Sequence, residues 1–170
     1  MTTKSESTNG EQEAHLAEGN AKQARKRVAA DALFCDEGGR ILIVKPTYKD
    51  AWDLPGGMAE ANESPHGAAN RELGEELWLT LPLIRVLVVD WVPPHGPWDD
   101  QLAFIFDGGI LTAEQCSSLR PRDRELSAIK FLEPDHAVKM LQKRIARRAA
   151  QALKALEEQI PRYLENGRLL

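Results

Sequence analysis

Three glutamates stand close together near the middle of the chain: Glu72, Glu75 and Glu76, in the stretch RELGEELWL. In a helix, like charges three or four residues apart destabilise by roughly 0.2–0.5 kcal/mol per pair. Arg71 can pair with Glu75, but no Lys or Arg lies four residues after Glu72 or Glu76. A divalent cation would compensate the remaining charge, because Mg²⁺ and Mn²⁺ favour carboxylate oxygens. The cluster predicts a metal site, and a helix face softened by salt bridges is the alternative.

The residues before and between these glutamates predict the helix that carries them. Ser64 can cap its first turn, and Pro65 fits there because its missing N–H would have no partner in the helix. An apolar stripe at helical spacing follows, made of Ala68, Ala69, Leu73 and Leu77. The carboxylates therefore lie on one helix of about three turns.

Apolar and β-branched runs predict strands on both sides of this helix. A hairpin is expected from residue 27 to residue 44, because an Asp-Glu-Gly-Gly turn separates two apolar runs. Further strands are expected over 84–92, 101–109 and 125–132. The core of one domain is therefore expected over residues 27–135.

The two ends of the chain have a different character. Residues 1–26 are polar and predict a disordered or flexible arm that is at most loosely helical. Residues 136–170 predict an amphipathic helix packed on the domain, with apolar residues at helical spacing from Val138 to Leu156. Its other side is basic: Lys139, Lys143, Arg144, Arg147, Arg148 and Lys154. That side is either a solvated face or a surface for a homodimer or an anionic ligand.

Composition narrows the class of protein. The chain has 170 residues and a net charge of −4, which argues against nucleic acid or an anionic membrane as its main ligand. Cys35 and Cys116 are too few for a disulfide framework, so a reducing cytoplasm is expected. Apolar runs are too short to cross a membrane, and residues 1–26 lack the apolar region of a signal peptide.

The glutamates also belong to a longer pattern. The motif G-x5-E-x7-R-E-U-x-E-E-x-G-U, where U is a bulky aliphatic residue, marks the Nudix family. This chain resembles it at Gly57, Glu63, Arg71, Glu72, Leu73, Glu75, Glu76 and Leu79. One position departs, because Trp78 stands where the family has glycine in a left-handed helix end. Trp78 is expected to change that helix end and to shift the loop after it.

The resemblance implies an α/β fold, namely an α/β/α sandwich with a mixed sheet between the motif helix and a long C-terminal helix. It also implies a Mg²⁺-dependent hydrolase, with Mn²⁺ as a substitute, that cleaves a nucleoside diphosphate linked to another group. By resemblance, the ligands of the metal are Glu72, Glu75, Glu76 and the carbonyl of Gly56. Gly57, Glu63 and Arg71 would support the site.

The general base and the substrate are less closely specified. Glu72 or Glu76 could remove the proton from water, and Glu125, just before the last expected strand, is a third candidate. Aromatic and imidazole side chains are the candidates for contact with a nucleotide-type small molecule: Tyr48, Trp91, His95 and Trp98. Two alternatives to the hydrolase are a catalytically silent nucleotide-binding module of the same fold and an enzyme like isopentenyl-diphosphate isomerase.

Overall fold

A computed structural model describes residues 3–122 and 124–170. The strands are β1 Arg27–Asp36, β2 Ile41–Pro46, β3 Gly56–Met58, β4 Val86–Val92, β5 Gln101–Leu111, β6 Leu126–Leu132, β7 Arg162–Glu165 and β8 Arg168–Leu169. The helices are α1 Thr3–Lys22, α2 Pro65–Leu77, α3 Ala113–Ser118, α4 Pro134–Met140 and α5 Lys143–Glu158. None of the helices in the described ranges combines the length and the apolar character needed to span a membrane.

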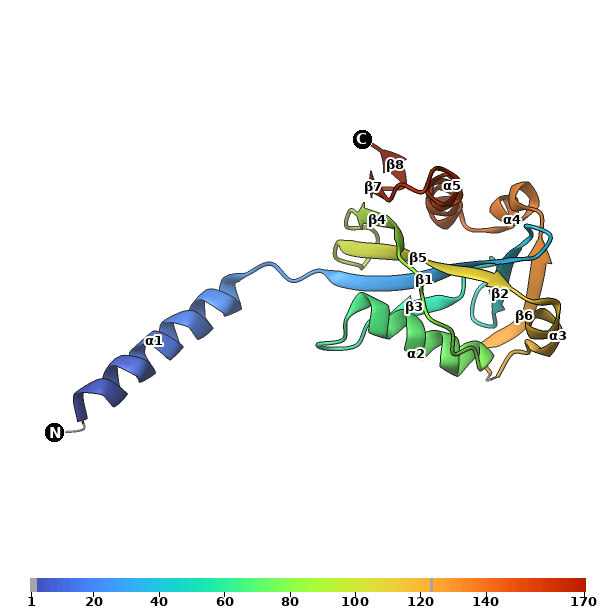
Figure 1. The fold of residues 1–170 in the computed structure, drawn as a ribbon. Helices are drawn as coiled ribbons and strands as arrows, with labels where there is room; N and C mark the ends of the chain where they lie inside the picture. Colours follow the sequence, from blue (N-terminus) through green and yellow to red (C-terminus); the bar gives the residue numbers. More distant parts are fainter. Residues whose placement is uncertain (1–2, 123) are drawn as a thin grey trace.

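The strands form one mixed sheet between two helical layers (Figure 1). Its order is β6-β2-β1-β5-β4-β7-β8, and β3 pairs with β1 beside this path. The β1–β5 and β4–β7 pairs are parallel, whereas the others are antiparallel. α2 covers one face, and α4 and α5 cover the other. The predicted α/β/α sandwich with a mixed sheet is confirmed.

Alternation along β1 supplies an apolar surface to each layer. Ala30, Ala32 and Phe34 pack in the cluster that includes Leu73 and Leu77 of α2. Leu33 packs on the opposite face, in the cluster that includes Ala149, Ala152 and Ala155 of α5. Because successive side chains of a strand point to opposite faces, one apolar run holds both helical layers.

The C-terminal segment is two helices and a hairpin, so the continuous amphipathic helix expected within residues 136–170 is wrong. α4 ends at Met140, and the residue after it, Leu141, is extended (φ −72°, ψ 153°) and buried. The chain stays extended there because Leu141 bridges to Trp52, whose backbone N–H donates to the Met140 carbonyl at 3.4 Å. The periodic pattern continues across this break and does not reveal it.

The hairpin of β7 and β8 was not predicted from the sequence. Asn166 and Gly167 both have positive φ, 54° and 75°, and an Asn-Gly pair between short strands is a strong signal for such a turn. β7 adds to the sheet beside β4 in parallel. This hairpin therefore brings the C-terminal end of the chain back onto the domain (Figure 1).

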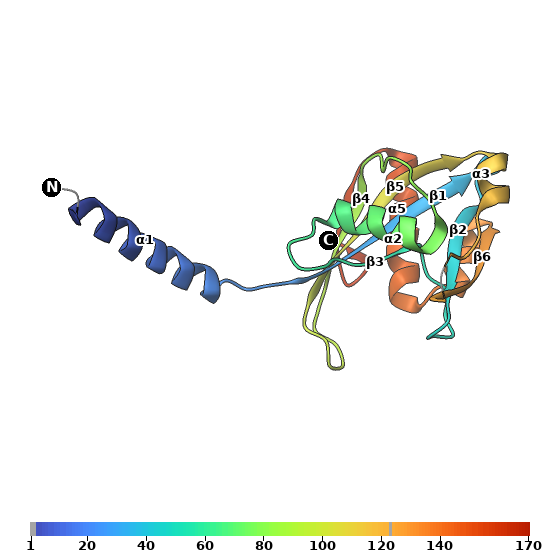
Figure 2. The same cartoon turned by 90° about the horizontal axis from the view of Figure 1, so that it is seen from below.

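The N-terminal arm is helical over α1 and lies well away from the sheet in two perpendicular views (Figures 1 and 2). From Gly10 to Lys22 its residues are exposed, apart from the partly covered Gly19. The arm was expected to be at most loosely helical, and its flexibility stays a prediction. Residues 1 and 2 lie outside the described part of the chain.

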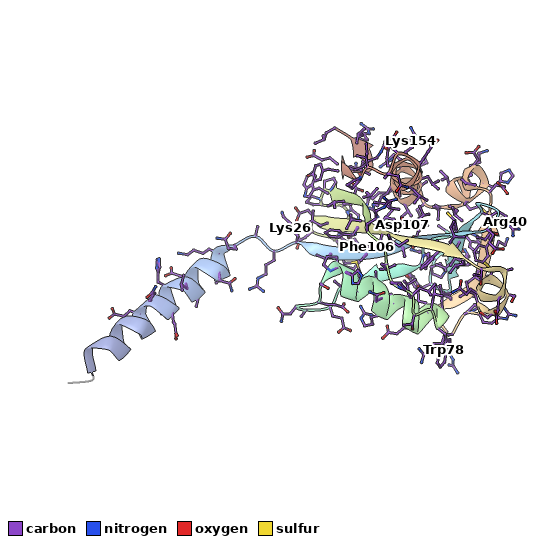
Figure 3. The ribbon with its side chains drawn as sticks, viewed as in Figure 1. Lys26, Arg40, Trp78, Phe106, Asp107 and Lys154 are labelled. Atoms are coloured by element: carbon purple, nitrogen blue, oxygen red, sulfur yellow. The ribbon has the colours of Figure 1, made fainter. Side chains whose placement is uncertain are left out.

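Trp78 ends α2 in the left-handed conformation that glycine would adopt, so the expected change in the helix end is wrong. Its φ is 57° and its ψ is 26°. The N–H of Trp78 donates to the Gly74 carbonyl at 3.3 Å, and that of Leu79 to the Leu73 carbonyl at 3.1 Å. The Trp78 side chain is exposed at the end of α2 (Figure 3). Arg122 places its guanidinium 3.6 Å from the centroid of the indole ring. This cation–π contact offsets part of the backbone strain.

Two variants separate strain from stacking at this position. Trp78→Ala should lower the free energy of unfolding by about 0.5–1 kcal/mol, because an exposed cation–π contact is worth about that much. Trp78→Gly loses the same contact but relieves the left-handed strain of about 1–2 kcal/mol. It should therefore be more stable than the Ala variant by about 1 kcal/mol in urea unfolding. Equal stability of the two variants would contradict strain at residue 78.

Candidate active site

The site is built where α2 approaches the short strand β3. Gly56 and Gly57 pair with Asp31 and Ala30 of β1. Gly56 has φ 138°, and a Cβ there would lie 2.3 Å from the Ala30 carbonyl oxygen. A Cβ on Gly57 would lie 2.5 Å from the carboxyl carbon of Glu72. The two glycines therefore allow a carboxylate of α2 to reach the strand backbone.

The three glutamates of α2 occupy different environments at this contact. Glu76 is buried, and its Oε2 accepts a hydrogen bond from the Gly56 N–H at 3.2 Å. Glu72 is half-buried against Gly57, whereas the Glu75 side chain is 55% exposed. The helix thus directs two of its three carboxylates toward β3.

Arg71 connects these carboxylates to the loop after β3. Its guanidinium donates to both oxygens of Glu63 at 3.0 Å and to the Met58 carbonyl at 3.0 Å. Its Nη1 also donates to Glu72 Oε1 and to Glu75 Oε2, each at 3.0 Å. Arg71 and Glu63, which the resemblance implied would support the site, are thus paired with each other, and Arg71 also pairs with Glu75 as expected.

The donor set matches a hard divalent cation in its chemistry. Carboxylate oxygens and a backbone carbonyl are the ligands that Mg²⁺ accepts. Over residues 3–122 and 124–170, no group of three His, Cys, Asp or Glu side chains is already clustered to hold a metal. Arg71 engages Glu72 and Glu75 in the arrangement seen, and the Gly56 N–H engages Glu76. The residues therefore fit such an ion in their type and in their position. In the structure, their carboxylates accept hydrogen bonds from Arg71 and from the Gly56 N–H.

The charges of the site shift two carboxyl pKa values in opposite directions. Burial raises the pKa of Glu72, Arg71 opposes this, and the charges of Glu75 and Glu125 raise it further. Hydrogen bonds from Arg71 lower the pKa of the partly buried Glu63. Glu125 thus lies within electrostatic reach of Glu72, next to a loop whose Thr47 N–H donates to the Glu125 carbonyl at 2.7 Å.

A cavity of about 660 Å³ opens beside Gly56 and Gly57. Tyr48, His95 and Trp98 line it, and their contact with a substrate stays a prediction. Trp91 is not among the residues that line the cavity. Its indole N–H donates to Asp100 Oδ2 at 2.9 Å and holds the loop before β5. The loop that carries His95 and Trp98 projects from the body in Figure 2. Three of the four residues proposed for substrate contact therefore share one cavity.

Three charged residues of this cavity were not predicted from the sequence: Asp31, Lys49 and Asp53. Arg148, from the basic side of the expected C-terminal helix, lines it as well. Burial and the charge of Asp53 raise the pKa of Asp31 to about 7, while Arg148, whose Nη1 is 3.8 Å from it, opposes the shift. Lys49 pairs with Asp53. One signal was available, since Asp31 interrupts the apolar run of β1 in RVAADALF.

Removing the charge of Glu72 should stabilise the folded chain at pH 7. Its pKa is raised above the ordinary value of 4.5. Stability is therefore lost as the pH rises from about 4.5 through the raised pKa. Glu72→Gln removes this loss, so its free energy of unfolding at pH 7 should exceed that of the parent. Urea unfolding in EDTA, with no added metal, measures the difference.

Glu63→Gln should have the opposite sign and serves as the matched variant. The pKa of Glu63 lies below its ordinary value of 4.5. The stabilisation is therefore complete above about pH 4.5 and is lost as the pH falls through the lowered pKa. Glu63→Gln should thus reduce the free energy of unfolding at pH 7. Changes of the same sign in the two variants would contradict the electrostatic assignment.

The chain is similar to known proteins in its sequence and in its fold. The chain is 27% identical over 130 residues to a MutT-like protein of Streptomyces ambofaciens, covering 74% of this chain and 76% of that one. It is 37% identical over 62 residues to an RNA pyrophosphohydrolase of Hydrogenovibrio crunogenus, covering 35% of this chain and only 38% of the relative. The NUDIX domain of Shewanella oneidensis NrtR, solved with ADP ribose, has the same fold. Its TM-score is 0.65 at 18% identity, over 82% of this chain and 97% of that one. The model of the NUDIX domain family matches residues 25–156, and the chain therefore belongs to that family.

Proposed function

We propose that this chain is a Mg²⁺-dependent pyrophosphohydrolase that cleaves a nucleoside diphosphate linked to another group. One observation carries the proposal: the carboxylates of Glu72 and Glu76 meet the Gly56–Gly57 backbone at the rim of the 660 Å³ cavity. A diphosphate in that cavity would lie beside residues suited to hold its counter-ion. Membership of the NUDIX family and the likeness to an RNA pyrophosphohydrolase support the same reaction.

Glu72, Glu75, Glu76 and the Gly56 carbonyl would hold the ion. Bound there, Mg²⁺ would neutralise the diphosphate oxygens and lower the pKa of water. Arg71 fixes the loop that follows β3 through both oxygens of Glu63, so the Gly56–Gly57 backbone keeps its position. Orientation by such outer partners commonly changes metal affinity or activity 10–100-fold.

Water attacks one phosphorus of the diphosphate while the bond from that phosphorus to the bridging oxygen breaks. The other phosphate group leaves with the bridging oxygen, and a carboxylate of this chain accepts the proton of the water. Glu72 suits the role because burial raises its pKa, which brings it nearer to the working pH. Glu76 is buried and oriented by the Gly56 N–H. Glu125 stays a third candidate, since its charge acts on Glu72 from the residue just before β6.

The cavity wall suits a nucleotide. Trp98 is 54% exposed and Arg27 contacts its ring 4.5 Å from the centroid, so an aromatic surface stands at the cavity. Tyr48 and His95 complete a wall on which a base can stack.

We place the protein in a reducing cytoplasm, where its two free cysteines, Cys35 and Cys116, would stay thiols.

A nucleotide-binding module without hydrolysis is the second candidate. Arg71 supports it, because hydrogen bonds from its guanidinium already occupy Glu72 and Glu75. In that case the cavity would bind a nucleotide while the carboxylates stay paired with arginine.

The hydrolase is tested with a panel of nucleoside triphosphates, dinucleoside polyphosphates, ADP-ribose and sugar nucleotides, each with Mg²⁺ or with EDTA. One class should be turned over only with Mg²⁺, and Glu76→Gln should lower kcat by at least about 100-fold. Mn²⁺ should restore activity after EDTA treatment. Binding of a panel member without turnover would favour the silent module.

Two glycines of the same region make a matched pair of variants. Gly57→Ala puts a Cβ 2.5 Å from the Glu72 carboxyl carbon and should reduce Mg²⁺-dependent turnover by about 10–100-fold, since it displaces a ligand. Gly74→Ala adds a Cβ in open space within α2. It should keep turnover and raise the free energy of unfolding by about 0.5–1 kcal/mol. Full activity of Gly57→Ala would contradict the role of Glu72.

A further inference from the structure

The basic residues of the C-terminal helices divide between two places. Lys143, Arg144, Arg147 and Arg148 line the 660 Å³ cavity beside Gly56 and Gly57. Lys139 and Lys154 instead line a separate groove of about 520 Å³ between α4 and α5. In Figure 3, Lys154 lies at the outer side of α5. The first half of α5 therefore presents its cations to the proposed substrate.

Carboxylates compensate some of the cations of this cavity. Arg148 is buried and its Nε donates to Asp90 Oδ2 at 3.0 Å. Its Nη1 also lies 3.8 Å from Asp31 Oδ2. Lys49 is paired with Asp53. These two cations are therefore parts of ion pairs.

Three cations of the wall lie outside the ion pairs of the described residues: Lys143, Arg144 and Arg147. Arg147 donates to the carbonyl and to the side-chain oxygen of Asn166, at 3.1 and 3.4 Å, and both acceptors are neutral. Its positive charge is therefore not cancelled by its partners. An anion in the cavity would supply the missing compensation.

The stability of α5 does not favour this arrangement of cations. Lys143 and Arg147 are four residues apart on α5, and like charges at that spacing destabilise a helix. Lys143 and Arg144 also begin the helix, where its dipole disfavours cations. The chain as a whole is acidic, with a net charge of −4. These cations are thus concentrated at one cavity, although the chain as a whole is acidic.

The hairpin of β7 and β8 keeps the wall in position. The Gly167 N–H donates to Asp90 Oδ1 at 2.9 Å, and the other oxygen of Asp90 accepts from Arg148. A Cβ on Gly167 would lie 2.9 Å from the Cβ of Arg147. The Asn166–Gly167 turn therefore packs directly on the arginine that it binds.

We propose that Lys143, Arg144 and Arg147 bind a phosphate of the substrate other than the two of the scissile diphosphate. The inference rests on the proposed function and specifies its substrate class: a diphosphate compound that carries at least one further phosphate. The scissile diphosphate lies by Gly56 and Gly57, and the further phosphate faces α5 across the cavity. The proposal assigns this part of the basic surface to a ligand, and a homodimer stays a prediction.

Binding of inorganic tripolyphosphate in EDTA tests the cationic wall without metal or turnover. Isothermal titration at low salt should show binding to the parent chain and at least a tenfold weaker affinity for Arg144→Gln/Arg147→Gln, since the double variant removes two charge-assisted contacts to the anion. Lys154→Gln removes one charge from the same helix at the other groove and should bind as the parent does. Equal weakening in Lys154→Gln, or unchanged affinity in the double variant, would overturn the proposal.

A pair of substrates tests the substrate class. The ratio of kcat/KM for diadenosine tetraphosphate to that for ADP-ribose should fall about tenfold in Arg144→Gln/Arg147→Gln, because only the first carries phosphates beyond a diphosphate. An unchanged ratio would overturn the inference while leaving the hydrolase intact. Tripolyphosphate binding without any turnover would instead retain the wall and reject the proposed hydrolysis.

Discussion

The contacts of a single guanidinium hold the candidate site together. Arg71 donates to Glu63, Glu72 and Glu75 and to the Met58 carbonyl. Without it, three carboxylates would repel one another and the loop after β3 would lose its anchor on α2. The planar guanidinium suits this task because it offers several donors in fixed directions, which a lysine does not. The position of the Gly56–Gly57 backbone beside α2 depends on this network.

The short strand β3 explains how groups from opposite sides of the sheet can meet. α2 lies on one face and α5 on the other, so the body of the sheet separates them. β3 has three residues and pairs with β1 beside the main strand path. Its two glycines have no side chains, so carboxylates approach from α2 while the cavity lined by α5 remains open. Acidic groups of α2 thus reach the same Gly56–Gly57 backbone that lines the cavity with the basic groups of α5.

Both charged helices are less stable than they could be. α2 concentrates anions and α5 concentrates cations, each at spacings where like charges repel. Burial adds to the cost at Glu72, whose pKa is raised. Trp78 adds backbone strain that glycine would avoid, and its contact with Arg122 offsets part of it. Unfavourable charge placement of this kind is typical of binding sites, because the ligand supplies the missing partner.

The amino-acid sequence by itself determined the motif helix, the strand runs on either side of it and the family. Those features rest on local periodicity and on residues close together in the chain, such as Glu72, Glu75 and Glu76. It also indicated Tyr48, His95 and Trp98, which share the cavity. Only the tertiary structure decided that Asp31 and Arg148 face that cavity and that Trp91 supports a loop. It also decided where the C-terminal helix breaks and that the Asn166–Gly167 turn packs on Arg147. Each of these depends on contacts between residues far apart in sequence, which periodicity does not encode.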